Sequence, residues 1–127
     1  MPFVNIYLPE SFTQQVKTQI SLSVHQSLMS IFNVPEKDYF QVIHPVKAEH
    51  LLYPDSYLNI SHTANLIYIH IVCASGRTVS MKQALYKLIA EKITETTPVG
   101  ASDVIIVLTE TAFENWSFGQ GIAQMIN

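Results

Sequence analysis

Pro2, which follows Met1 and opens the apolar run from Pro2 to Leu8, is the residue with the clearest chemical potential in this chain. A methionine ahead of a residue as small as proline is normally removed during synthesis, so we expect Pro2 to expose a secondary amine. A chain-end amine titrates at about 7.7–8.0 when unperturbed, and burial in an apolar pocket lowers its pKa by disfavouring the charged form. Such an amine can exchange protons near neutral pH. From the Met-Pro dipeptide alone, an ordinary chain start is the favoured interpretation.

Arg77 is a candidate for binding an anion, because it stands between an apolar segment and the expected start of a helix. The amides of a helix's first turn favour an anion, and a guanidinium beside them can hold a carboxylate with two hydrogen bonds. The alternative interpretation of Arg77 is a solvated side chain in a Gly-Arg turn.

Asp38, Trp116 and Phe118 are the remaining candidates for a site. Asp38 opens the expected strand over 38–46 and could be an ordinary turn carboxylate or lie near the amine of Pro2. Near the amine, its negative charge would favour the protonated form and oppose the effect of burial, so the balance would decide whether Pro2 acts as acid or base. Trp116 and Phe118 could wall a pocket and exclude water, or could simply pack within a C-terminal segment.

Two β-α-β units are expected to position these residues. In the first, residues 2–46, we predict a strand over 3–8, a helix opened by a capping box of Ser11 and Gln14, and a strand over 38–46. In the second, residues 65–110, we predict a strand over 65–73, a helix from about Thr78 or Ser80, and a strand over 104–108. An irregular connection over 47–63 links the units, and residues 112–127 are predicted to form a hairpin or arm.

An α+β fold follows from this order. Each crossover should be right-handed and should bring its two strands parallel, which gives a four-stranded mixed sheet with both helices on one face. We expect one domain over residues 1–127. The third and fourth strands are apolar on both faces, so we predict that the face without helices packs against other subunits.

The composition favours an oligomer. Charged residues make up 13% of the chain, against roughly a quarter in ordinary domains, and hydrophobic residues make up 48%. The net charge is −3 with seven scattered Lys and Arg, which gives no basic patch for nucleic acid or for a membrane surface.

Targeting and cofactor signals are missing from the sequence pattern. The longest apolar stretch, residues 66–74, is too short to span a bilayer, and no signal-peptide pattern occurs. Cys73 is the single cysteine, which fits a reducing compartment, so we expect a cytoplasmic protein. We expect no metal, because no Cys, His and carboxylate cluster has ligand spacing, and no cofactor, because no phosphate loop or dinucleotide fingerprint occurs.

Several short sequence segments indicate a resemblance to a known family. They are Val34-Pro35-Glu36-Lys37-Asp38 with Gln41, then Arg77 before Tyr86-Lys87-Leu88, then Asp103-Val104, and Trp116-Ser117-Phe118-Gly119-Gln120-Gly121. With the Met-Pro start and the duplicated β-α-β order, the chain resembles the tautomerase superfamily, and most specifically the branch containing malonate semialdehyde decarboxylase. The resemblance spans nearly the whole chain, and its most distinctive element is the Trp-Ser-Phe-Gly-x-Gly stretch.

The resemblance implies a homotrimer with an active site at each subunit boundary and the amino-terminal proline at its centre. It also implies that Arg77 binds substrate and that Asp38 hydrogen-bonds the active-site water or the proline. One departure concerns the turn before the second helix, where the decarboxylases carry two arginines one residue apart. Ser75 stands in place of the first, so the resemblance makes Ser75 a candidate for contact with substrate, and the missing arginine puts decarboxylation in doubt. The 47–63 connection also departs from the family's usual histidine- and proline-bearing version.

Three functions therefore remain open. The first is cofactor-independent proton transfer on a small keto or enol carboxylic acid, with neutral Pro2 as the base. The second is decarboxylation or hydration of a small 3-oxo acid, with protonated Pro2 polarising the carbonyl. The third is a non-catalytic ferredoxin-like binding domain, which a retained Met1 would favour because an acylated proline nitrogen is not basic.

Overall fold

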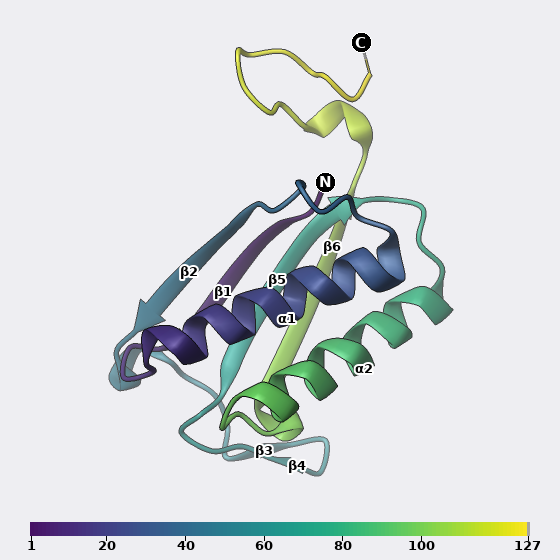
Figure 1. The fold of residues 1–127 in the computed structure, drawn as a ribbon. Coiled ribbons are helices and arrows are strands. Elements are labelled where there is room, and N and C mark those ends of the chain that lie inside the picture. The colour runs from purple at the N-terminus through teal and green to yellow at the C-terminus, as the bar shows by residue number, and fades with distance from the viewer. Residues whose placement is uncertain (127) are drawn as a thin grey trace.

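The computed structural model describes residues 1–126 and contains two long helices packed on one face of a four-stranded sheet (Figure 1). The helices are α1 (Gln14–Phe32) and α2 (Val79–Thr96). The sheet has the order β2-β1-β5-β6, formed by β1 (Phe3–Pro9), β2 (Gln41–Val46), β5 (Ile67–Ala74) and β6 (Val104–Thr111). β1 is parallel to β2 and antiparallel to β5, and β5 is parallel to β6. The predicted α+β fold with a mixed sheet is confirmed.

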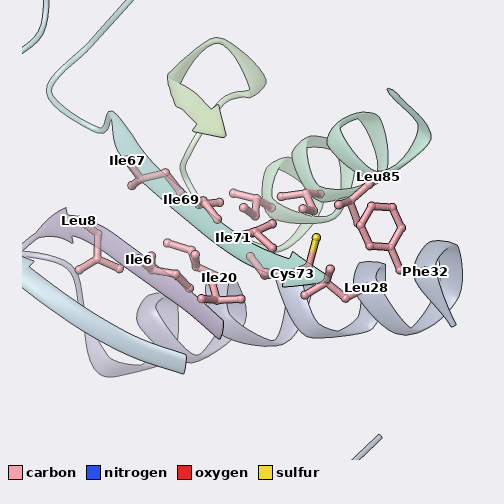
Figure 2. Close-up of a cluster of buried hydrophobic side chains, with 14 of the residues drawn as sticks. Ile6, Leu8, Ile20, Leu28, Phe32, Ile67, Ile69, Ile71, Cys73 and Leu85 are labelled. Atoms are coloured by element: carbon pink, nitrogen blue, oxygen red, sulfur yellow. The ribbon is translucent and has the colours of Figure 1, made fainter. Parts of the chain in front are cut away.

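The core lies between the sheet and the helices, and it follows the strand alternation of side chains. Figure 2 shows the inward residues of β1 and β5 meeting those of the two helices. The largest fully buried side chains include Ile6, Leu8, Ile20, Leu28, Ile67, Ile69, Ile71, Leu85, Ile89 and Ile93. Full burial of one such side chain stabilises a fold by about 1.5–3 kcal/mol, so this set fixes both helices on the sheet.

Several predicted boundaries are wrong. β5 begins at Ile67 rather than at residue 65, and β6 extends to Thr111 rather than ending at residue 108. The cap of α1 is Thr13 rather than Ser11, because the Thr13 hydroxyl accepts a hydrogen bond from the Val16 amide at 3.2 Å. The second strand begins at Gln41 rather than at residue 38, because the Asp38 amide donates to the Pro35 carbonyl at 2.9 Å in a turn. Asp38 therefore lies on a connecting segment, three residues before the strand.

The irregular connection over 47–63 contains a short 3₁₀ helix (Ala48–His50) and a small hairpin of β3 (Ser56–Tyr57) and β4 (Ile60–Ser61). Its end is anchored to the start of β6, where the buried Asp103 accepts a hydrogen bond from the Thr63 amide at 2.8 Å.

The C-terminal segment is an arm. It starts with a 3₁₀ helix (Phe113–Asn115) and continues in turns, without a strand between residues 112 and 126. Residue 127, the last of the predicted arm, lies outside the described residues. In Figure 1 the arm rises beyond the same end of the sheet at which the chain begins.

No helix within residues 1–126 is long and apolar enough to cross a membrane.

Candidate active site

The strand register brings the chain start together with three other segments. Phe3 pairs with Val72 of β5, so Pro2 lies beside the last residues of that strand. Val4 pairs with Gln41 of β2, so Pro2 also lies beside the segment that carries Asp38. The end of β5 pairs with the end of β6, where Ala74 lies opposite Thr111 and the C-terminal arm departs. All the predicted site residues are therefore placed at one end of the sheet.

Asp38 contacts the chain end directly. The Met1 ammonium donates to Asp38 Oδ2 at 2.9 Å, and the two side chains are 13% and 34% exposed. Met1 is present in this structure, so the nitrogen of the buried Pro2 is an amide and the free amine belongs to Met1. A cavity of about 170 Å³ opens at this pair, lined by Met1, Asp38, Phe40, Phe118 and Met125. The geometry places a carboxylate, an amine and apolar walls around one small space.

Aromatic rings continue the apolar wall from β2 to the arm. The ring of Phe118 lies 5.4 Å from that of Phe40 and is stacked on the indole of Trp116 at 5.5 Å. A neighbouring hollow of about 280 Å³ is lined by Phe3, Phe40 and residues 115–118. The indole Nε1 of Trp116 is buried and has no hydrogen-bond partner among residues 1–126. Both predicted wall residues, Trp116 and Phe118, thus border a hollow at the chain start.

Arg77 is held at the same sheet end by two contacts. Its Nη1 donates to the Ala74 carbonyl at 2.9 Å, and its guanidinium carbon lies 4.9 Å from the ring centroid of Phe32. Gly76 before it has φ 126°, a left-handed conformation that glycine adopts without steric cost. The side chain is half-buried, but it does not line the cavity beside Asp38.

The turn that carries Ser75 is fixed to β6. The Ser75 amide donates to the Thr111 carbonyl at 3.2 Å, while the residue itself is exposed. Glu110 accepts a hydrogen bond from Lys82 at 2.5 Å. The Lys82 hydrogen bond is the main cause that lowers the pKa of Glu110, and the Gly76 amide adds to it.

Cys73 lies near this turn on the inner side of the sheet. Burial raises the pKa of its thiol, and the positive charge of Arg77 opposes this effect only in part. The protonated thiol is a poor nucleophile, so Cys73 belongs to the core. No group of three or more His, Cys or carboxylate side chains that could hold a metal ion occurs in the described part of the chain.

Sequence reasoning missed Phe40, Met125 and Phe32. Phe40 was detectable as an apolar residue two positions after Asp38, at the entrance to a strand. The contact of Phe32 with Arg77 joins the end of α1 to the start of α2, and no sequence spacing predicts it. Met125 reaches the cavity only because the arm folds back over the chain start.

Comparison with known proteins identifies the family. A family model described as "Tautomerase enzyme" matches residues 38–119, and a second model with the same description matches residues 2–59. The chain belongs to the tautomerase family.

This tautomerase has relatives along its whole length. It is 42% identical to the probable tautomerase YusQ of Bacillus subtilis (strain 168) over 126 residues, which cover 99% of each chain. It is 29% identical to the probable tautomerase YrdN of the same organism, over 99% of this chain and 97% of the relative. The protein is therefore an isomerase-type enzyme.

Solved structures confirm the fold and the predicted branch. The structure of FG41 malonate semialdehyde decarboxylase inhibited by 3-bromopropiolate has a TM-score of 0.90 and 30% identity, over 96% of this tautomerase and 92% of that chain. Another malonate semialdehyde decarboxylase structure has a TM-score of 0.89 at 21% identity, over 97% of this tautomerase and 95% of that chain. A fused 4-OT symmetric trimer shares the fold with a TM-score of 0.80 at 15% identity, over 97% of this chain and 96% of that one.

Proposed function

We propose that this tautomerase catalyses cofactor-independent proton transfer on a small keto or enol carboxylic acid, with Pro2 as the acid and base once Met1 is removed. One observation carries the proposal: the chain end, Asp38 and the aromatic side chains meet around a single cavity. Removal of Met1 turns the amide nitrogen of Pro2 into a secondary amine and moves the chain end by one residue, on the order of 3.8 Å.

The roles of the other residues follow from charge and position. Asp38 contacts the Met1 ammonium at 2.9 Å, and we assign it the same task toward the Pro2 amine, namely orienting the ring and its proton. Arg77 supplies positive charge at the neighbouring end of β5 for the substrate carboxylate, with Ser75 beside it. Phe118 lines the cavity, and Trp116 is stacked on it from the neighbouring hollow; together they exclude water and so strengthen charge interactions within the cavity.

The proposed active enzyme is a homotrimer. The fused 4-OT neighbours are symmetric and asymmetric trimers, and their fold is shared by this chain. The sheet face without helices exposes apolar side chains, among them Phe3, Val42 and Val107, each more than a third exposed. A trimer covers such a face, and it brings neighbouring chains toward the open cavity at the sheet end.

The first test is the ketonisation of phenylenolpyruvate, followed by ultraviolet absorbance, with protein whose intact mass shows that Met1 is absent. We expect turnover by the wild type and a loss of at least about a hundred-fold in kcat for Pro2→Ala, because an acid or base in position contributes roughly 10²–10⁴-fold. Inactive wild-type protein with a free Pro2, or unchanged turnover by Pro2→Ala, contradicts the proposal. A Pro9→Ala variant, at the far end of β1, is the control for loss of a proline as such.

A second candidate function is decarboxylation or hydration of a 3-oxo acid. It is supported by the place of Asp38, whose carboxylate contacts the chain-end ammonium at 2.9 Å and would bond in the same way to a protonated Pro2 that polarises a carbonyl. Ser75 in the turn before α2 counts against it, since that turn supplies one arginine for the departing carboxylate instead of two. Carbon dioxide release from malonate semialdehyde, with Pro2→Ala as the control, measures this activity.

A further inference from the structure

Helix α1 buries four polar side chains: Ser21, Ser23, His25 and Ser27. Ser23 and Ser27 satisfy their hydroxyls within the helix, since they donate to the carbonyls of Gln19 and Ser23 at 2.7 Å. Ser21 and His25 instead bond outside the helix. They lie four residues apart and therefore on one face, one turn above the other. Both bond to residues of the connecting segment that carries Asp38 or of the strand that follows it.

His25 holds that segment on both sides of Asp38. Its Nε2 lies 2.8 Å from the carbonyl oxygen of Glu36, and because a carbonyl only accepts, Nε2 is the donor. Its ring is stacked on that of Tyr39 at 4.2 Å and an interplanar angle of 19°. The residue two before Asp38 and the residue directly after it are thus both fixed to one side chain that is 5% exposed.

Ser21 completes the attachment one turn earlier. Its hydroxyl donates to the side-chain oxygen of Gln41 at 2.7 Å, so the hydroxyl of Tyr39 must donate to Ser21. The Gln41 side chain donates back to the Ser21 carbonyl at 3.3 Å. These bonds join α1 to the first residue of β2 and to the neighbour of Asp38. The backbone of Asp38 therefore lies between two anchored positions.

Stability alone does not account for these polar groups. Burying a hydroxyl or an imidazole costs free energy unless each polar atom is bonded, and apolar side chains of similar volume often serve a core as well or better. Within residues 1–126 the Asp38 side chain forms a hydrogen bond only with the chain end, so its direction depends on the backbone around it. A small displacement of a catalytic group can lower a rate by as much as a hundred-fold.

We propose that His25, together with Ser21 and Tyr39, is a positioning residue that aims the Asp38 carboxylate at the chain-end amine. The inference rests on the proposed function, because it gives Asp38 its task there. His25 touches neither the cavity nor the chain end, so its influence passes through the backbone from Glu36 to Tyr39.

Two substitutions of His25 separate its donor from its ring. His25→Phe keeps an aromatic ring against Tyr39 but removes the donor to Glu36, whereas His25→Gln keeps an amide donor in a place similar to Nε2. With Met1 removed and phenylenolpyruvate or malonate semialdehyde as the probe, we expect His25→Phe to lower kcat roughly ten-fold with little change in KM. We expect His25→Gln to restore most of kcat. The control is Ser27→Ala, which removes a buried hydroxyl of the same helix that bonds only within it.

The decisive comparison uses an Asp38→Asn background. If His25 acts through Asp38, His25→Phe has no further effect on kcat there, because the two changes share one pathway. The inference is overturned if His25→Phe retains wild-type kcat, if His25→Gln is as impaired as His25→Phe, or if the losses multiply in the Asp38→Asn background. Should His25→Phe fail to fold by circular dichroism, Tyr39→Phe removes only the hydroxyl bonded to Ser21 and must show a smaller loss that also vanishes with Asp38→Asn.

The same kinetic measurements distinguish failure of the proposed function from failure of the inference about His25. Wild-type kcat in Asp38→Asn refutes the task given to Asp38 and this inference with it, but leaves proline-based catalysis standing if Pro2→Ala is inactive. If the wild type turns over neither phenylenolpyruvate nor malonate semialdehyde, the proposed function and the inference are refuted together. If Asp38→Asn has a lowered kcat but its loss multiplies with that of His25→Phe, the inference about His25 is refuted and the proposed function stands.

Discussion

The guanidinium of Arg77 is fixed before any substrate arrives. One nitrogen is bonded to the Ala74 carbonyl and the guanidinium carbon lies 4.9 Å from the ring centroid of Phe32, while the guanidinium carries further N–H donors that can serve a ligand. A lysine cannot reproduce this arrangement, since it has no planar fork with a pair of parallel donors. The residue is therefore suited to hold a carboxylate at a set orientation rather than merely to attract charge.

Replacement of Arg77 should reduce catalytic efficiency with carboxylate substrates. A hydrogen bond to a charged group is worth about 1.5–3 kcal/mol, so we expect Arg77→Ala to lower kcat/KM by roughly ten- to a hundred-fold, and Arg77→Lys to recover only part of it. Steady-state kinetics at several substrate concentrations measures the effect. The control is Lys87→Ala, a cation on the exposed side of α2 that lies near Glu91. Equal kinetics for Arg77→Ala and the wild type would make Arg77 an ordinary turn residue.

At the scale of elements, the sequence predicts what depends on periodicity and misses what depends on contact between elements. The β-α-β order follows from runs such as Val4, Ile6 and Leu8, whose alternation determines which side is buried. The cap of α1 was misplaced because Ser11 and Thr13 are both good cap residues, and only the backbone turn after Pro9 decides between them.

Some residues of the candidate site could likewise be predicted from the sequence, and others could not. Pro2, Asp38 and Arg77 could be selected from their chemistry and from the family resemblance, and the register then explains why they share one sheet end. The stack of His25 on Tyr39 could not be predicted, since a buried histidine in an amphipathic helix gives no sign of its partner. Side chains that reach between elements depend on the packed backbone, which local sequence does not specify.

The cap itself gives a prediction for α1. Thr13→Ala removes the acceptor of the Val16 amide, and we expect the free energy of unfolding to fall by about 1 kcal/mol. Ser11→Ala, two residues earlier and outside the helix, should change it little. Urea denaturation monitored by circular dichroism compares both variants with the wild type. A larger effect of Ser11→Ala than of Thr13→Ala would move the start of the helix back to the position expected from the sequence.

The whole molecule has two unlike faces. One side of the sheet is covered by α1 and α2, as Figure 1 shows, and its side chains form the core. The other side bears Phe3, Val42 and Val107 along with polar residues such as Asn5 and His44, which bond to each other at 2.8 Å. A face that exposes apolar side chains and pairs Asn5 Oδ1 with His44 Nε2 is suited to a contact between subunits, because the apolar side chains gain from leaving water and these two atoms keep each other as partners.

A charge placed on this face should prevent assembly. Val107 lies in the middle of β6 and is 55% exposed in one chain, so Val107→Glu would bury an unpaired carboxylate in a trimer, at a cost of several kcal/mol. We expect sedimentation equilibrium at micromolar concentration to give three times the 14.3 kDa of one chain for the wild type and a mass near one chain for Val107→Glu. Gln83→Glu adds the same charge on the exposed side of α2 and should remain trimeric. A wild type that sediments as one chain would refute the trimer, whereas a trimeric Val107→Glu would place the contact elsewhere.

Because we propose that the trimer brings neighbouring chains to the cavity, loss of assembly in Val107→Glu should also abolish turnover of phenylenolpyruvate.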